Sequence, residues 1–327
     1  MATQITIIGL GQVGASIGLA LGAHKDRFVC IGHDKNMETA HQAQKKGAVD
    51  RVSFNLPSSV EGSQIVVLAL PLSQIQDTLR YVSQDVPHGA LVLDTAPVKS
   101  EVAKWAAKYL PSGRHYVGLM PAINPEFLTS AGAGLESAKA DLFTRGLFMI
   151  DVPLGTPGEV VELTADFIRL LGATPLFTDM LESDGLSAST HVLPQLLAAC
   201  LLNSTIDQPG WQEGRKLASR AFAAGTAGMA DHDDVDSLSM AVLQNRESTL
   251  HKLNSVITSL FDLREAIESG DESTLTNYLK QARTGRARWL DERAAADWTQ
   301  MKGEQIETQS LSERMFGTLF SRAKKKE

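Results

Sequence analysis

Apolar residues follow two different patterns in the two halves of the chain. In the first half, short continuous runs of aliphatic and β-branched residues alternate with stretches of helical spacing. Continuous apolar runs are typical of strands that are covered on both faces, as in a parallel sheet. The runs predict strands at residues 4–8, 28–32, 64–70, 89–94, 115–119, 146–152 and 173–177.

Helices are predicted between these strands, at residues 37–46, 72–82, 98–110 and 157–171. Gly47 is the expected C-terminal stop of the first helix, and Pro157 suits the first turn of the last one, where a missing N–H costs little. Short strands that alternate with helices indicate βαβ units. We therefore predict an α/β fold with an N-terminal, doubly wound and mainly parallel sheet.

Strand patterns stop at about residue 180, and the rest of the chain predicts helices only: up to about 206, from about 211, over 235–269, and from 272 into the arginine-rich segment 283–293. We divide the chain into a nucleotide-binding domain (1–180), an all-α domain (181–300) expected to form a homodimer with its copy, and a C-terminal tail (301–327). An amphipathic stripe within 235–269 predicts a face packed in the core. It consists of Leu243, Leu250, Leu253, Ile257, Leu260 and Leu263.

A glycine-rich turn joins the first strand to a helix of small residues, with glycines at positions 9, 11 and 14. This spacing is typical of a dinucleotide-binding loop. Gly9 would make the tight turn, Gly11 would let the backbone approach a pyrophosphate, and Gly14 would let helix and strand pack closely. The free N–H groups of the helix N-terminus would face the anion.

Asp34 follows the second strand, at the distance where an acidic residue accepts hydrogen bonds from the ribose hydroxyls and repels a 2′-phosphate. NAD is therefore favoured as cofactor, while the neighbouring Lys35 and Lys45 leave NADP possible. The predicted cofactor contacts are Gly9, Leu10, Gly11, Gln12, Val13, Gly14, Asp34, Leu70, Pro71 and Asp94.

Charge and cysteine usage narrow the class of protein. The 327 residues contain 38 acids and 31 bases, a formal charge of −7 that offers no general attraction to nucleic acid. A small molecule is the expected ligand. Cys30 and Cys200 are far apart and in no metal-ligand spacing, so we expect two buried thiols, no metal site and a cytoplasmic protein.

Membrane attachment is not expected. The N-terminus lacks the pattern of a signal peptide, and the longest later apolar run, residues 196–202, is far shorter than a membrane span and predicts a buried helix. The tail segment 315–326 combines large apolar residues with a basic end. It suits a frayed or partner-docked terminus better than an interfacial helix.

Several segments resemble, in order, those of the prephenate and arogenate dehydrogenases of tyrosine biosynthesis. The similar segments are GLGQVGAS (9–16), GHD (32–34), DTAPVK (94–99), VGLMP (117–121), Asp184 with STHVLPQ (189–195), GW with RKLA (210–218) and LQNR (243–246). The resemblance covers residues 4 to about 290. It implies a Rossmann domain, a helical dimerisation domain, and a substrate cleft between them. The reaction that it implies passes a hydride to nicotinamide with loss of carbon dioxide as the substrate ring becomes aromatic.

The differences from the family pattern fall on its chemistry. Met120 occupies the position of the family's histidine before proline, and a thioether cannot take a proton. Pro97 replaces a serine, Gln195 replaces a second histidine, and Lys216, or Arg215 one residue away, falls where the family has a carboxylate-binding arginine. Either the substrate differs from the family's, or another group moves the proton.

His191 is the strongest replacement base, because histidine suits proton transfer near neutral pH and the helix that carries it should line the cleft. Lys99 follows the carboxyl end of a strand, where ligands bind in open α/β sheets. Asn124 could orient a nicotinamide or a substrate oxygen. These three are the catalytic candidates; each could equally be structural. The substrate-binding candidates are Gln195, Arg215, Lys216 and Met120, where cations suit an anionic substrate.

Three functions remain open from the sequence. The first is an NAD(P)-dependent dehydrogenase of the prephenate type. The second is a dehydrogenase or reductase of the β-hydroxyacid or imine type that acts on another substrate. The third is a nucleotide-binding protein that has lost catalysis, an alternative that the absent histidine at Met120 keeps open.

Overall fold

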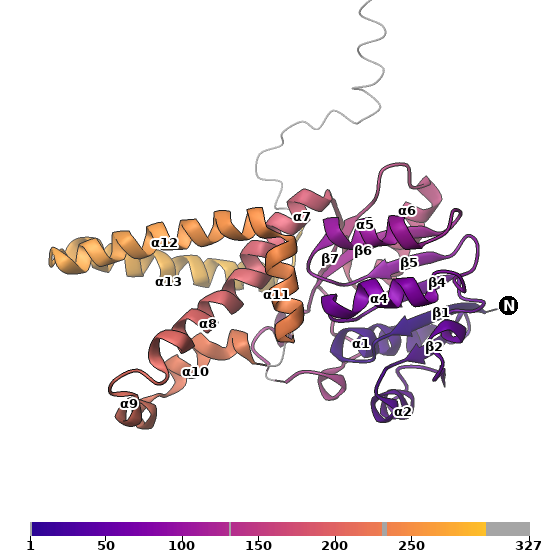
Figure 1. Ribbon diagram of the computed structural model, residues 1–327, viewed down its shortest axis with the longest axis horizontal. Helices are drawn as coiled ribbons and strands as arrows, with labels where there is room; N and C mark the ends of the chain where they lie inside the picture. The colour runs from indigo at the N-terminus through magenta and orange to yellow at the C-terminus, as the bar shows by residue number, and fades with distance from the viewer. Residues whose placement is uncertain (1, 131, 231–233, 299–327) are drawn as a thin grey trace, which may run out of the picture.

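The computed structural model describes residues 2–130, 132–230 and 234–298. Figure 1 shows two halves: a sheet with helices on both faces, formed by the N-terminal part of the chain, and a set of helices that projects away from it. The last strand ends at Thr178 and the first helix of the projecting half begins at Met180. The tail beginning at residue 301 lies outside the described residues, as does the segment 315–326.

The sheet has eight strands in the order β3-β2-β1-β4-β5-β6-β7-β8. All neighbouring strands are parallel except β6 and β7, which are antiparallel. The expected doubly wound, mainly parallel sheet is confirmed. The strands are β1 (Thr3–Ile8), β2 (Phe28–His33), β3 (Arg51–Val52), β4 (Ile65–Leu68), β5 (Leu91–Asp94), β6 (His115–Ala122), β7 (Leu147–Asp151) and β8 (Thr174–Thr178).

The chain leaves β1 in one direction along the sheet and returns to the other side of it at β4. The crevice beyond the carboxyl ends of these two strands is therefore the place where ligands bind in such sheets. The helices of this half are α1 (Gln12–Leu21), α2 (Met37–Lys45), α3 (Leu56–Ser59), α4 (Leu72–Val82), α5 (Lys99–Tyr109) and α6 (Gly158–Leu170), with short 3₁₀ turns at Gly22–His24, Pro125–Phe127 and Leu135–Ser137.

Two apolar cores lie on the two faces of the sheet, because successive side chains of a strand point to opposite faces. In β1, Ile5 and Ile7 pack with α1, α2 and α6, whereas Ile8 packs with α4 and α5. Val192 and Leu238 of the helical half belong to the second core. The helical half is therefore seated against the face that α4 and α5 cover.

The helical half consists of α7 (Met180–Ser187), a π-helical turn (Ala188–Val192), α8 (Leu193–Thr205), α9 (Trp211–Leu217), α10 (Arg220–Thr226), a 3₁₀ turn (Ala227–Met229), α11 (Val235–Gln244), α12 (Arg246–Glu268) and α13 (Glu272–Ala295). The prediction of one helix over 235–269 is wrong. Asn245 has a non-helical backbone and separates α11 from α12. The helix expected from residue 211 is likewise two short helices.

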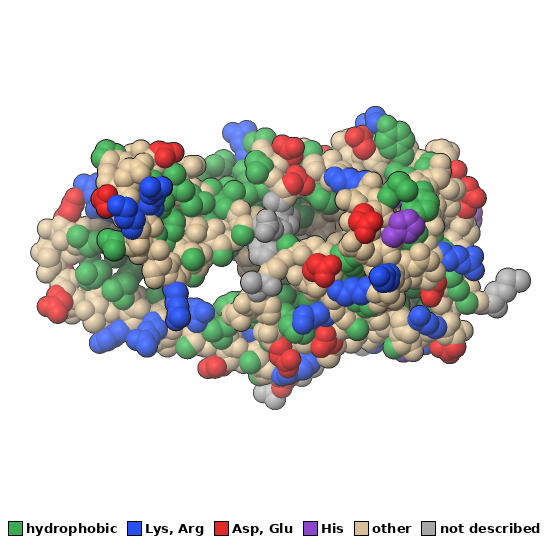
Figure 2. Space-filling model, turned by 90° about the horizontal axis from the view of Figure 1, so that it is seen from below, with side chains coloured by type: hydrophobic (Ala, Val, Ile, Leu, Met, Phe, Trp, Pro, Cys, Tyr) green, Lys and Arg blue, Asp and Glu red, His purple; other side chains and the backbone are tan. Residues whose placement is uncertain are grey.

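The leucine stripe of α11 and α12 does not face a core, contrary to expectation. Leu243 is 67% exposed, and Leu250, Ile257 and Leu260 are also exposed. Figure 2 shows apolar side chains at the surface of the helical half, at the left. The amphipathic pattern is real, but the described residues leave these four side chains exposed, and only Leu253 and Leu263 of the stripe are half-buried. Cys200 is also exposed rather than buried, whereas Cys30 is buried as expected.

The helical turns from Met180 to Thr205 form one continuous stretch. It is longer than the apolar run of residues 196–202 seen in the sequence. By length and composition alone this stretch would be long and apolar enough to cross a membrane. Core helices of soluble proteins pass the same test. In this chain Asp184, within the stretch, is buried and bonded to α5, and Val192 packs in the core of the sheet.

Candidate active site

The glycine loop lies between the end of β1 and the start of α1. Gly9 has φ +91°, a conformation that favours glycine. A Cβ on Gly14 would lie 1.9 Å from the carbonyl oxygen of Gly9, whereas a Cβ on Gly11 would meet nothing within 4 Å. Gly9 and Gly14 are therefore required by the fold, and Gly11 leaves space open above the loop. The first N–H groups of α1, from Gln12 onward, face this space, as an anion site requires.

Asp34 holds the glycine loop in place through hydrogen bonds to the backbone. One carboxylate oxygen accepts a hydrogen bond from the backbone N–H of Leu10 at 2.8 Å, and the other accepts from Asn36 at 2.8 Å. The contact with Leu10 is one that the sequence reasoning missed. A carboxylate offers about four acceptor positions, so ribose hydroxyls can still be bound.

The other predicted cofactor residues line this loop in different ways. Leu10 is buried, and Val13 packs against the first core. Gln12 donates to the carbonyl of Ser137 at 3.4 Å. Leu70 and Pro71 follow β4, where Pro71 is the N-cap of α4. They stand at the carboxyl edge of the sheet, next to the glycine loop.

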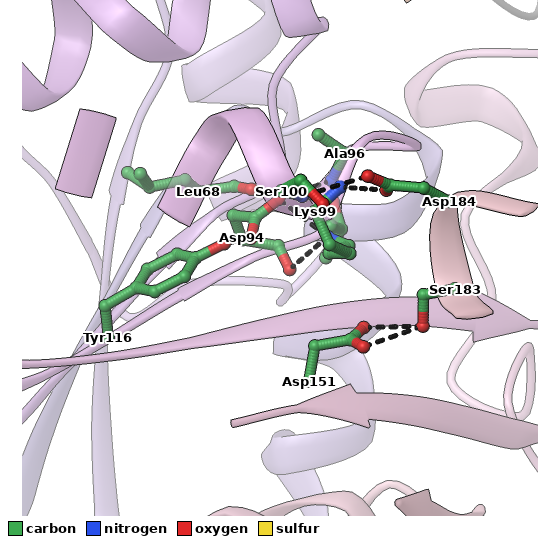
Figure 3. Close-up of polar contacts among 10 residues, drawn as sticks. Leu68, Asp94, Ala96, Lys99, Ser100, Tyr116, Asp151, Ser183 and Asp184 are labelled. Carbon is green, nitrogen blue, oxygen red and sulfur yellow. Dashed lines mark hydrogen bonds and ion pairs between the residues drawn. The ribbon is translucent and has the colours of Figure 1, made fainter. Parts of the chain in front are cut away.

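A buried ionic cluster occupies the same edge of the sheet, at β5, β6 and α5 (Figure 3). The ammonium of Lys99 lies 2.7 Å from Oδ1 of Asp94, and both side chains are fully buried. The hydroxyl of Tyr116 donates to Oδ2 of Asp94 at 2.6 Å. Burial, followed by the negative charge of Asp94, raises the pKa of Tyr116 well above its ordinary value. Lys99 and Asp94 are therefore held away from solvent, and this geometry favours a positioning role for both.

Gly118 makes room for this cluster. It lies in register with Asp94 on β5 and with Asp151 on β7. A Cβ on Gly118 would approach Cδ of Lys99 to 2.7 Å. The aliphatic stem of Lys99 therefore passes over the glycine on its way to Asp94.

Asp184 joins the two halves of the molecule at this cluster. Its carboxylate, on α7, accepts the backbone N–H groups of Lys99 at 2.6 Å and of Ser100 at 3.2 Å. It therefore caps the N-terminus of α5, where a negative charge is favourable. The carbonyl of Asp184 in turn accepts a 2.6 Å hydrogen bond from Nδ2 of Asn245.

Asp151 completes the cluster from β7. It is fully buried, and the Ser183 hydroxyl lies 2.7 and 2.9 Å from its two oxygens. Burial raises its pKa to about 6, against the lowering effects of the Ser183 hydrogen bond and the Lys99 charge. Tyr116, Asp151 and Ser183 were not among the predicted residues. The sequence offered one signal for them: each is a polar residue within a stretch that is otherwise predicted to be apolar and buried.

His191 lies in the π-helical turn between α7 and α8. Such single turns are frequent at functional sites. The amide of Gln195 donates to the carbonyl of His191 at 3.0 Å. Val192, next to His191, packs in the core that contains Ile8 at the end of β1 and Ala96 after β5. His191 and Gln195 therefore lie in the segment of the helical half that packs on the sheet.

Met120 and Asn124 lie at the end of β6 and in the turn that follows it. Met120 is partly exposed and pairs with Met149 of β7. Asn124 is buried: its amide donates to the carbonyl of Asp141 at 3.3 Å, and its oxygen accepts from the N–H of Glu126 at 3.1 Å. The side chain of Asn124 is thus occupied in shaping the turn.

Arg215 and Lys216 are not brought to this edge within one chain. Both are exposed on α9, which Figure 1 shows at the end of the helical half remote from the sheet. Lys216 pairs with Glu213 at 2.7 Å. In the described part of the chain, no group of three His, Cys, Asp or Glu residues could hold a metal ion.

Comparison with known proteins gives one consistent answer. Residues 17–175 match the family model described as prephenate dehydrogenase, nucleotide-binding domain. Prephenate dehydrogenase of Bacillus subtilis (strain 168) is 27% identical over 294 residues, which cover 88% of this chain and 76% of the relative. Prephenate dehydrogenase of Lactococcus lactis (strain MG1363) is 23% identical over 86% of this chain and 75% of the relative. These matches support a member of the prephenate/arogenate dehydrogenase family, as the resembling segments of the sequence predict.

Solved structures of the family share the fold. Prephenate dehydrogenase from A. aeolicus, in complex with hydroxyphenyl propionate and NAD+, has a TM-score of 0.76 at 19% identity, covering 88% of this chain and 98% of that one. Synechocystis arogenate dehydrogenase has a TM-score of 0.68 at 22% identity, covering 88% of this chain and all of that one (100%). The match to this nucleotide-binding domain and to these dehydrogenases confirms the expected class of enzyme and cofactor, an NAD(P)-dependent dehydrogenase.

Proposed function

We propose that the protein oxidises and decarboxylates prephenate, arogenate or a closely related anionic acid, with NAD as the preferred acceptor. The observation that carries this proposal is the open glycine cradle at the end of β1, which Asp34 holds through the N–H of Leu10. The π-helical turn with His191 packs on the same sheet half, because its Val192 belongs to the core that contains Ile8. Curated relatives named prephenate dehydrogenase support the substrate class.

The residues present fit a dinucleotide. Gly11 leaves its Cβ position open above the N-terminus of α1, where a pyrophosphate would be held by backbone N–H groups. Asp34 would accept the ribose hydroxyls. When bound, the nicotinamide supplies the acceptor for a hydride from the substrate ring carbon that bears the hydroxyl.

His191 would take the proton of that hydroxyl. A general base must reach the proton through one hydrogen bond or one water, and the side chain of His191 is partly exposed, so a ligand can reach it. Met120, at the position of the family's histidine, has no group that can accept a proton. Gln195, one helical turn after His191, would donate to a substrate oxygen, and the Met120 side chain would pack against the substrate ring.

Arg215 and Lys216 would bind a substrate carboxylate from the partner subunit, since α9 of the same chain lies remote from the sheet edge. This assignment depends on a homodimer through the helical half. The exposed apolar residues of α12, among them Ile257, Leu260 and Phe261, support such a dimer.

The activity is tested by mixing purified protein with prephenate or arogenate and with NAD or NADP, and following the absorbance of the reduced nicotinamide. We expect turnover that His191→Ala lowers by at least about a hundredfold, as removal of a general base does. His88→Ala is the matched control, because His88 is exposed before the first residue of β5, at the opposite edge of the sheet. Turnover that survives in His191→Ala would disprove the assignment of the base.

A dehydrogenase of the β-hydroxyacid or imine type, acting on another substrate, is the second candidate. It is favoured by Pro97 and Met120, which lack the groups found in the family, and by the enclosure of Lys99. NADH binding without oxidation of either prephenate or arogenate would support it.

The dimer is tested by sedimentation or light scattering. Leu260→Glu should shift the protein to monomer, whereas Leu154→Glu, an exposed leucine of the sheet half, should not. If both variants keep the wild-type mass, the α12 surface is not the interface.

A cytoplasmic location is supported by the two cysteines, both free.

A further inference from the structure

The turn after β6 is held from two sides. On one side, the backbone N–H of Asn124 donates to the carbonyl of Leu142 at 2.7 Å, and the Asn124 side chain bonds to Asp141 and Glu126. On the other side stands the C-terminal end of α13, 170 residues later in the chain. A helix of the projecting half thus returns to the turn that follows Met120.

Arg293, in the last turn of α13, makes the first contact. Its Nη2 donates to the carbonyl of Ile123 at 2.6 Å. The guanidinium lies over the ring of Trp298, with Cζ 5.0 Å from the ring centroid. The side chain is half-buried, and desolvation lowers the pKa of the guanidinium. Hydrogen bonds from charged donors are stronger than those between neutral groups, so this contact fixes the position of Ile123.

Arg145 makes the reciprocal contact from the sheet half. Its Nη2 donates to the carbonyl of Ala294, and its Nη1 lies 3.7 Å from Oε1 of Glu126 in the same turn. Cations are favourable at the C-terminal end of a helix. Arg145 also has φ +61°, an uncommon conformation for a residue other than glycine. Each half therefore offers an arginine to a carbonyl of the other.

We propose that Arg293 is a positioning residue for the active site: by bonding to Ile123 it holds in place the turn that follows Met120 and carries Asn124, with Arg145 as its counterpart. We call Arg293, Ile123, Arg145 and Ala294 the α13 clasp. The proposal rests on the proposed function in one respect, that Met120, directly before this turn, packs against the substrate ring at the reacting end of the cofactor. α13 packs along α12, whose apolar surface is exposed, so the clasp also links that surface to the turn (Figure 1).

The clasp is tested by hydrogen exchange of the full-length protein, without substrate. In R293M, amides in the segment 123–128 should exchange about tenfold faster than in the wild type, as expected for loss of one charge-assisted hydrogen bond. R288M is the matched control. Arg288 is exposed on the same helix and makes one long ion pair, with its Nε 3.9 Å from Oε1 of Glu292. R145G removes the other half of the clasp and relieves its backbone strain, so it keeps the test valid if R293M does not fold.

Unchanged exchange at 123–128 in both R293M and R145G would overturn the proposal, whatever the enzyme's substrate. Where turnover is measured, R293M should lower kcat about tenfold and change the KM for NAD less than twofold, because the turn directly follows Met120, at the reacting end and not at the adenosine. A residue that only stabilised the fold would lower Tm and leave kcat per folded molecule unchanged. Absence of turnover in the wild type would count against the proposed function alone, since the exchange result stands without it.

Discussion

The ammonium of Lys99 lies 2.7 Å from the carboxylate of Asp94, and neither side chain has exposed surface. The same lysine donates its backbone N–H to Asp184 of the helical half. One residue therefore neutralises a buried charge in the sheet and, through its backbone, ties the two halves together. Breaking a buried pair on one side leaves an uncompensated charge, which costs more than the pair contributes.

Lys99→Met should destabilise the protein by about 3–5 kcal/mol, since it leaves Asp94 buried without a counter-ion. Denaturant unfolding measures the change. Lys104→Met is the matched control, because Lys104 is 72% exposed in its pair with Glu101, and it should change stability by less than about 1 kcal/mol. Equal effects of the two substitutions would show that the buried pair is not important for stability.

Gly118→Ala should cost about 1–3 kcal/mol by overpacking, since its Cβ would approach Cδ of the enclosed Lys99 to 2.7 Å. Gly285→Ala should have the opposite sign. Gly285 lies inside α13 with nothing within 4 Å of its Cβ position, and alanine is favoured over glycine in a helix by about 0.5–1 kcal/mol. Thermal unfolding of both variants checks the two signs, and a neutral Gly118→Ala would mean that Lys99 can move aside.

Asp151 should make stability depend on pH. Burial raises the pKa of Asp151 from 3.8 to about 6, so the folded state binds this proton more tightly than the unfolded state does. Its contribution to the free energy of unfolding is therefore fully present below about pH 4 and is lost as the pH rises to about 6. The loss is up to about 3 kcal/mol, at 1.36 kcal/mol per pKa unit. Asp151→Asn should flatten the stability profile in this window. Asp262→Asn, at an exposed position of α12, should leave the profile unchanged, and a slope that persists in Asp151→Asn would assign it to another group.

Asp34→Ala should weaken NADH binding about tenfold and NADPH binding less, since the carboxylate accepts the ribose hydroxyls and repels a 2′-phosphate. Both affinities should fall somewhat, because Asp34 also accepts the N–H of Leu10. Quenching of tryptophan fluorescence measures the two constants. Asp166→Ala, at an exposed position of α6, is the control; equal losses for both cofactors in Asp34→Ala would refute the ribose contact.

Gly11→Ala and Gly14→Ala should separate binding from folding. The Cβ at Gly11 meets nothing within 4 Å, so Tm should hold while NADH affinity falls at least about tenfold through contact with the pyrophosphate. The Cβ at Gly14 would lie 1.9 Å from the carbonyl of Gly9, so this variant should lose stability as well, by more than about 1–3 kcal/mol. An unaltered NADH affinity in Gly11→Ala would place the pyrophosphate elsewhere.

Local sequence was sufficient wherever the structural cause is local. Continuous apolar runs predicted seven of the eight strands of the sheet. The eighth, β3, has two residues and no such run. Glycine spacing predicted a turn in which Gly9 has positive φ and Gly14 admits no side chain. The family resemblance also rested on short contiguous segments, and the comparisons confirm it.

Tertiary structure decided what depends on contacts between distant segments. It enclosed Lys99 with Asp94 and Tyr116, because three neighbouring strands and a helix N-terminus meet at one sheet edge. It broke the helix expected over 235–269 at Asn245, whose amide bonds to the carbonyl of Asp184. It left the leucine stripe of α12 exposed, because periodicity records an apolar face but not what covers it. The contact between Arg293 of α13 and the turn after β6 joins residues 170 positions apart, so it is visible only in the folded chain.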